Sequence, residues 1–146
     1  MFYIACDHGG LELKAAVIKK LEGLGEAVTD LGTDSEQSVD YPDYGFAVAK
    51  KVAAESNARG IVICKTGVGM SICANKVKGV RCALCTSVDM GRLCREHNDA
   101  NVLALGASNT DTATALSIVE AFATTEFAGG RHANRVNKIT GYENNG

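Results

Sequence analysis

The chain has 146 residues, of which 46% are hydrophobic and 22% charged, and its formal net charge is −2. This length suits one compact domain, 1–146, with a hydrophobic core, and it is short for two. The slightly acidic balance lacks the basic surplus of a protein whose main partner is a nucleic acid. No apolar run approaches membrane-spanning length, so we expect no membrane partner.

Six cysteines lie within apolar runs of the sequence. The first residues, up to Asp7, show neither a basic leader nor the apolar region of a signal peptide. We therefore expect a cytoplasmic protein with free thiols, not a secreted protein with a disulfide framework.

Five short apolar runs alternate with longer segments of helical character. The predicted strands span 2–6, 27–31, 60–64, 81–85 and 101–105. Continuous hydrophobicity, without alternation, is typical of parallel strands whose sheet is covered by helices on both faces. The predicted fold class is α/β, a three-layer Rossmann-like sandwich with a five-stranded parallel sheet in an order that the sequence does not set.

Helices are predicted between these strands. In the first, the apolar face is formed by Leu11, Ala15, Ile18 and Leu21, the solvated face by Lys14, Lys19 and Lys20, and Gly25 ends the helix. The next helices are predicted over 43–57, 68–76, 88–97 and 111–124. A polar terminal helix over 131–139 follows a glycine pair, and we expect it to pack on a partner subunit.

Ligands of an open parallel sheet bind beyond the carboxyl ends of its strands. The third strand ends at Cys64, and a turn with glycines at 67 and 69 leads into the next helix. Such a turn and the helix start direct backbone N–H groups toward one point, which predicts a site for a small anion. The helix start and Lys65 would both favour the thiolate form of Cys64.

Each of these features also has a purely structural interpretation. A free cysteine at a strand end is more often a small buried hydrophobic residue than a reactive group. Gly-x-Gly turns also occur in phosphate loops, dinucleotide folds and plain tight turns. Neither nucleotide fingerprint is complete, because no Gly-Lys-Ser/Thr follows and Ile72 stands at the third glycine position of Gly-x-Gly-x-x-Gly.

The segment 63–76 resembles the signature loop of the type B ribose-5-phosphate isomerases, in the ribose/galactose isomerase family. Further family motifs follow in order over nearly the whole chain, at 6–10, 39–44, 95–102 and 129–135. The resemblance implies an aldose–ketose isomerase that interconverts ribose 5-phosphate and ribulose 5-phosphate through a cis-enediolate. It implies no cofactor and no metal ion.

The resemblance also assigns the reacting groups. Cys64 would be the base, because Met70 stands where a related branch of the family has a glutamate. His97 would donate the proton that opens the sugar ring, and Asn98 would orient hydroxyl groups. Asp7 and Thr66 would hold the hydroxyl and carbonyl oxygens between which charge moves.

The remaining substrate contacts also follow from the resemblance. Arg131 and Arg135 lie four residues apart, one helical turn, and with His8 they would bind the phosphate. Tyr41 would assist His97 or line the pocket. The substrate loop comprises Lys65, Gly67, Val68, Gly69 and Ser71. The family builds its active site across a dimer interface, which implies a homodimer or a dimer of dimers.

Structural roles are the alternative for most of these residues: a helix-end histidine for His97, turn and loop-cap residues for Asp7 and Thr66, and a solvated basic face for Arg131 and Arg135. Cys82 and Cys85 form a Cys-x-x-Cys spacing, but their side chains on a strand would point to opposite faces, so we interpret both as core residues.

Two positions depart from the family pattern. Lys65 stands where most members have glycine, and Ser108 stands where the family usually has an arginine that contacts the phosphate. Allose or galactose 6-phosphate therefore remains an alternative substrate. A noncatalytic phosphate- or nucleotide-binding module and a thiol redox protein are alternative functions.

Overall fold

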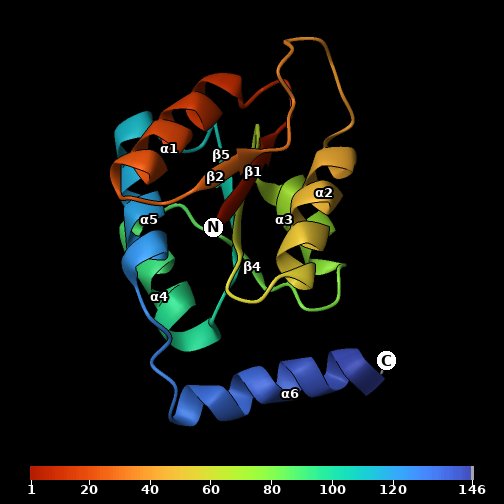
Figure 1. The fold of residues 1–146 in the computed structure, drawn as a ribbon, viewed down its shortest axis with the longest axis vertical. Coiled ribbons are helices and arrows are strands. Elements are labelled where there is room, and N and C mark those ends of the chain that lie inside the picture. Colours follow the sequence, from red (N-terminus) through yellow and green to blue (C-terminus); the bar gives the residue numbers. More distant parts are fainter. Residues whose placement is uncertain (146) are drawn as a thin grey trace.

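The computed structural model describes residues 1–145. Five parallel strands form a sheet in the order β2-β1-β3-β5-β4 (Figure 1). The strands are β1 (Phe2–Cys6), β2 (Val28–Asp30), β3 (Arg59–Cys64), β4 (Cys82–Leu84) and β5 (Val102–Gly106). The predicted α/β class and the parallel five-stranded sheet are confirmed.

Helices cover both faces of the sheet and create two separate apolar cores (Figure 1). One face packs against α1 (Leu11–Gly23), α4 (Val88–Asn98) and α5 (Thr112–Thr124). The other packs against α2 (Tyr41–Ala54) and α3 (Val68–Asn75). The last helix, α6 (Arg131–Asn145), lies outside these layers, beyond the end of α4. None of the helices described in residues 1–145 has the length and apolar character needed to cross a membrane.

Burial along the strands follows their place in the sheet. Every residue of β1 and β5 is buried, and only the first residue of β3 is partly exposed. The edge strands β2 and β4 are half-buried or exposed throughout, and they are shorter than the predicted 27–31 and 81–85. Continuous hydrophobicity therefore predicts the central strands well. It predicts the limits of the edge strands less well, because an edge strand has a neighbouring strand on one side only.

The strand order creates a switch point between β1 and β3. The chain leaves β1 toward β2 on one side, whereas β3 pairs with the other side of β1, with Cys6 opposite Ile63. The carboxyl ends of these two strands therefore lie side by side, and the loops that follow them diverge. Open α/β sheets bind ligands in this position.

The predicted faces of α1 are partly wrong. Lys14 belongs to the predicted solvated face but is 4% exposed, whereas Ala15 of the predicted apolar face is exposed. The Lys14 Nζ donates to Asp30 Oδ1 at 2.8 Å and to the Thr33 carbonyl at 2.7 Å. A lysine can be buried here because these acceptors satisfy its ammonium group.

Two other helices differ from their predicted limits. Helix α2 starts at Tyr41, two residues early, because Pro42 fits the first turn of a helix, and it ends at Ala54 instead of 57. Helix α6 continues to Asn145, well past 139. All six cysteines are free, and Cys85 and Cys82 belong to opposite faces of the sheet, as predicted.

Candidate active site

The loop after β3 holds Cys64 at the start of a tight turn into α3. Cys64 is 5% exposed, and the backbone N–H of Gly67 donates to its Sγ at 3.2 Å. Gly67 precedes the first residue of α3 and has a φ of 80°, in the left-handed region that favours glycine. The sulfur therefore lies against a backbone donor at the amino end of a helix, where negative charge is stabilised.

Close packing explains both glycines of this turn. A Cβ at Gly67 would lie 2.6 Å from Leu84 Cδ1 and 2.9 Å from the backbone carbon of Leu105. A Cβ at Gly69 would lie 2.5 Å from the ring of Tyr41, at the start of α2. The absence of a side chain at Gly67 lets the turn pack against β5, and its absence at Gly69 lets the Tyr41 ring approach the loop.

The segment after β5 holds the backbone of the loop after β3, which we call the cysteine loop. The Ala107 N–H donates to the Cys64 carbonyl and the Ser108 N–H to the Lys65 carbonyl, each at 2.9 Å. The Asn109 side-chain amide donates to the Thr66 carbonyl at 3.1 Å. These three contacts extend the β3–β5 pairing beyond the sheet and fix the loop backbone.

The loop after β1 lies beside the cysteine loop. Asp7 is buried, and its Oδ1 accepts the N–H of Gly9 at 2.9 Å. A Cβ at Gly9 would lie 3.3 Å from Asp7 Oδ1 and 3.8 Å from Lys65 Cβ, which places the two loops in contact range. His8 is exposed, and its Nδ1 accepts the Val39 N–H at 3.2 Å, so the loop before α2 helps to orient its ring.

The start of α3 is fixed by its own polar side chains. Thr66 Oγ1 accepts the N–H of Val68 at 3.3 Å, and Ser71 Oγ donates to the Val68 carbonyl at 2.7 Å. Ten of the residues predicted for the site thus lie at one edge of the sheet. We call them the Cys64 cluster: Asp7, His8, Tyr41, Cys64, Lys65, Thr66, Gly67, Val68, Gly69 and Ser71.

The other predicted residues form a second group, which we call the His97 cluster: His97, Asn98, Arg131 and Arg135, together with His132. The rings of His97 and His132 stack, with centroids 4.3 Å apart and planes 16° apart. A cavity of about 310 Å³ is lined by all five of these residues and by Val136 and Ile139. Its two arginines make no ion pair with residues 1–145.

The two clusters lie at opposite ends of the parallel strands, the Cys64 cluster at the carboxyl ends and the His97 cluster near the amino ends. Cys64 ends β3 and pairs with Gly106, the last residue of β5, whereas Asn98 lies four residues before Val102, the first residue of β5. The four steps along β5 from Val102 to Gly106 span roughly 13 Å. Figure 1 shows α6 at one end of the molecule and the loops after β1 and β2 at the other. One chain therefore does not bring the clusters together.

His132 is the residue of this group that the sequence analysis did not assign to the site. It follows Arg131 in the glycine-preceded motif, but no spacing rule indicates that its ring stacks on a histidine from another helix. Partial desolvation and the positive charges of His97, Arg131 and Arg135 lower the pKa of His132.

Comparison with known proteins assigns this arrangement to a family. The model of the Ribose/Galactose Isomerase family matches residues 2–139. A Bacillus subtilis protein described as putative sugar phosphate isomerase YwlF is 48% identical over 141 residues, which cover 96% of this chain and 95% of that protein. The ribose-5-phosphate isomerase B of Escherichia coli is 44% identical over 138 residues, covering 94% of this chain and 93% of that one.

Solved structures agree in fold over almost the entire length. Ribose-5-phosphate isomerase B from Clostridium thermocellum is 50% identical with a TM-score of 0.94, covering 99% of this chain and 97% of that one. The Mycoplasma genitalium enzyme, solved with bound ribulose-5-phosphate, is 42% identical with a TM-score of 0.96 and the same coverage. The chain therefore belongs to the ribose/galactose isomerase family, among the type B ribose-5-phosphate isomerases.

Proposed function

We propose that this isomerase interconverts ribose 5-phosphate and ribulose 5-phosphate, with Cys64 as the base. The observation that carries the proposal is the Gly67 N–H at 3.2 Å from the Cys64 sulfur, at the switch point of the sheet. The ribulose-5-phosphate bound by the Mycoplasma genitalium relative supports the choice of sugar.

In the proposed reaction, the Cys64 thiolate removes the proton from C2 of the open-chain aldose. The electron pair of the C–H bond forms the C1–C2 double bond of a cis-enediolate, and the carbonyl oxygen takes the negative charge. Return of the proton to C1, with transfer of a hydroxyl proton between the two oxygens, gives the ketose. Backbone N–H groups at the start of α3 and the Thr66 hydroxyl would stabilise the enediolate oxygens.

We propose that two copies of the chain complete each site. The Cys64 cluster and the His97 cluster lie at opposite edges of the sheet within one chain, so a proton transfer that uses both needs a second molecule. A two-fold axis that brings the His97 cluster of one copy to the Cys64 cluster of the other creates two identical sites.

Exposed apolar side chains beside both clusters support this pairing. Val68 and Ile72 project from α3 next to Cys64, and both are about half exposed. Ile139 is exposed on α6, and Tyr142 is 83% exposed there. These two α6 residues also line a cavity of about 710 Å³ between α6 and the end of α3. A partner's α3 would bury this apolar surface.

In this arrangement His97 would act as the general acid that donates the proton opening the sugar ring. Asn98 would orient the hydroxyls beside it, and Asp7 would hold them from the other copy. Arg131 and Arg135 would bind the phosphate together with His8, since guanidinium groups pair with phosphate through two hydrogen bonds. Tyr41 would line the pocket.

Lys65 and Ser108 would adjust the preference among sugar phosphates. Their backbones are joined by the hydrogen bond from the Ser108 N–H to the Lys65 carbonyl, so the two residues are neighbours where the loops after β3 and β5 meet. Lys65 is exposed, and its Cβ would lie 3.8 Å from a Cβ at Gly9, in the loop after β1. It could supply the phosphate contact that a serine at 108 does not.

The test is isomerase activity on a panel of pentose and hexose phosphates, with the Cys64→Ala variant beside the unmutated protein. We expect activity on ribose 5-phosphate and a loss of kcat of about 10²- to 10⁴-fold in the variant. Cys73→Ala is the matched control, since Cys73 is also a buried cysteine of this region, on α3, and its activity should persist.

Full activity of Cys64→Ala would exclude the cysteine base. Inactivity of the unmutated protein on every sugar phosphate of the panel would exclude the proposed reaction and favour a noncatalytic phosphate-binding protein.

A further inference from the structure

A second polar cavity lies near the amino ends of the strands, beside the His97 cluster and at the opposite end of the strands from the Cys64 cluster. Its volume is about 290 Å³, and it is formed by the turn between α2 and β3 together with residues around the turn between α4 and β5. The lining includes Glu55, Ser56, Arg59, Arg81, Arg95 and Asp99. It shares no lining residue with the cavity of the His97 cluster.

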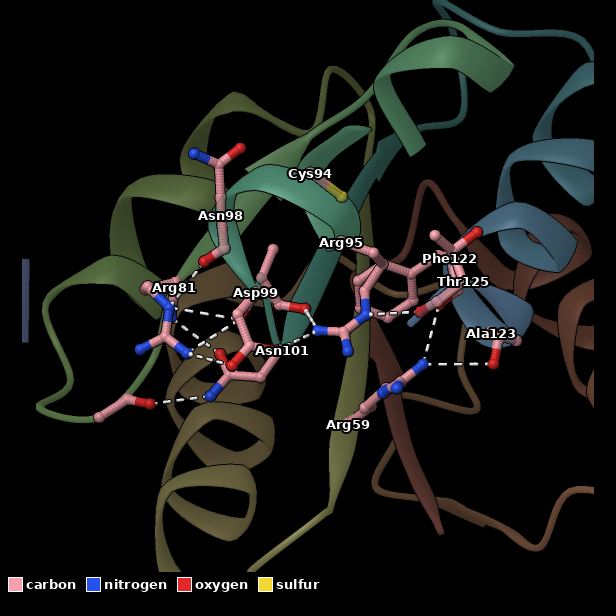
Figure 2. A network of polar contacts seen from close by, with 12 residues as sticks. Arg59, Arg81, Cys94, Arg95, Asn98, Asp99, Asn101, Phe122, Ala123 and Thr125 are labelled. Carbon is pink, nitrogen blue, oxygen red and sulfur yellow. Dashed lines mark hydrogen bonds and ion pairs between the residues drawn. The ribbon is translucent and has the colours of Figure 1, made fainter. Parts of the chain in front are cut away.

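Arg95 is the buried cation of this cavity, at 5% exposure. Its Nη1 donates to Asp99 Oδ1 at 2.8 Å and to the Ala100 carbonyl at 2.7 Å, and its Nε donates to the Thr125 carbonyl at 3.2 Å. Its Nη2 makes no hydrogen bond with residues 1–145. Figure 2 shows this nitrogen directed toward Arg59.

Arg59 contributes a second guanidinium on the facing side (Figure 2). Its Nη1 donates to the carbonyls of Phe122 and Ala123 at 2.9 and 3.2 Å, and the guanidinium lies 5.9 Å from the centre of the Phe122 ring. Within residues 1–145 it makes no ion pair. Burial and the charge of Arg95 lower the pKa of Arg59.

The two carboxylates of the lining are already engaged. Glu55 accepts the hydroxyl of Tyr3. Asp99 is shared by Arg95 and by Arg81, whose Nη2 lies 3.5 Å from Asp99 Oδ2. Three guanidinium groups and two carboxylates therefore line the cavity, which leaves the lining with one net positive charge. Neither carboxylate is ion-paired with Arg59.

We propose that this cavity is a binding site for a small phosphate-class oxyanion, held between the unpaired guanidinium nitrogens of Arg59 and Arg95. The carbonyls at the end of α5 account for the contacts of Arg59 Nη1 and Arg95 Nε, and the turn between α4 and β5 accounts for those of Arg95 Nη1. None of these contacts uses Arg95 Nη2, which has no protein partner within residues 1–145 and is not a fully buried atom. An oxyanion would satisfy that nitrogen and separate two like charges. The cavity is large enough for a phosphate group.

The test is isothermal titration calorimetry of the protein with inorganic phosphate, which measures the Kd. Because the proposed active site also binds phosphate, the titration uses a background in which Arg131→Gln and Arg135→Gln remove that contact. In this background we expect phosphate binding with a Kd in the millimolar range. Because this background lacks the proposed phosphate contact of the active site, phosphate binding in it tests the cavity whether or not the isomerase reaction is as proposed.

Ser56→Glu is the diagnostic variant, and Ser56→Gln is its neutral control of nearly equal size. Ser56 is exposed at the cavity and makes none of the arginine contacts, so both variants should fold. The added carboxylate should weaken phosphate binding about tenfold by repulsion, and the amide should leave it unchanged. No binding in the background, or equal effects of the two substitutions, would overturn the proposal.

The occupant's source is distinguished by a parallel titration with methyl phosphate. Tighter binding than inorganic phosphate would identify a phosphate monoester as the ligand, and weaker binding would identify the free ion. Both results support an oxyanion site, provided that Ser56→Glu weakens the binding of the ligand concerned.

Discussion

His97 and His132 stack with their ring centroids 4.3 Å apart, which joins the end of α4 to the start of α6. The first two turns of α6 carry Arg131 and Arg135, one helical turn apart. The stacked pair therefore sets the position of the proposed phosphate-binding arginines relative to the proposed ring-opening histidine.

Acidification should weaken this contact. The pKa of His132 is lowered below its ordinary 6.5 by partial desolvation and by the charges of His97, Arg131 and Arg135, against which Glu96 acts only partly. The unfolded chain then binds more protons than the folded one as pH falls from 6.5 through the lowered pKa, so stability is lost over that window. Thermal unfolding at pH 7.5 and pH 5 measures the loss.

His132→Gln is the variant for this prediction. It removes the titrating ring, so the difference in Tm between the two pH values should shrink relative to the unmutated protein. An undiminished difference would assign the pH dependence to other groups.

Lys14→Met should destabilise the fold although it replaces a charged residue with an apolar one. The change leaves the Thr33 carbonyl without its 2.7 Å donor and Asp30 without its 2.8 Å ion pair. Breaking such a buried contact from one side costs about 2 to 4 kcal/mol. Urea unfolding measures the free energy, and Lys19→Met, at an exposed position of the same helix, should change it little. Equal effects of the two variants would contradict the role assigned to Lys14.

Gly67→Ala should damage both stability and activity. A left-handed φ costs an L-residue about 1 to 2 kcal/mol, and the contact with Leu84 and Leu105 adds about 1 to 3 kcal/mol more. Gly25→Ala is the matched control, since Gly25 has a φ of 84° but nothing within 4 Å of an added Cβ. It should show only the first cost and keep full kcat. A Gly67→Ala enzyme with unchanged kcat would show that the Gly67 N–H is not needed at the Cys64 sulfur.

The sequence predicts the cysteine loop well because its chemistry is local. The strand that ends at Cys64, the glycines at 67 and 69 and the helix start at Val68 are consecutive, and each constrains the backbone of the next. Central strands are likewise predictable, since burial on both faces requires continuous hydrophobicity.

Features that depend on distant partners could not be predicted in the same way. Lys14 is buried because acceptors from 30 and 33 reach its ammonium group, and helical periodicity contains no sign of them. The strand order 2-1-3-5-4 places β5 between β3 and β4, which only packing decides. The His97–His132 stack joins positions 35 residues apart through the placement of α6.

Mixing two inactive variants tests most directly whether the site is shared between two copies. Cys64→Ala lacks the proposed base, and the Arg131→Gln, Arg135→Gln double variant lacks the proposed phosphate contact. After the two are unfolded and refolded together in equal amounts, native mass spectrometry confirms mixed dimers, each with one intact site. Isomerase activity should then recover to about one quarter of the unmutated level, because half of the dimers are mixed and each has one of two sites. Activity that stays at the level of the separate variants, with mixed dimers present, would contradict a site built from two chains.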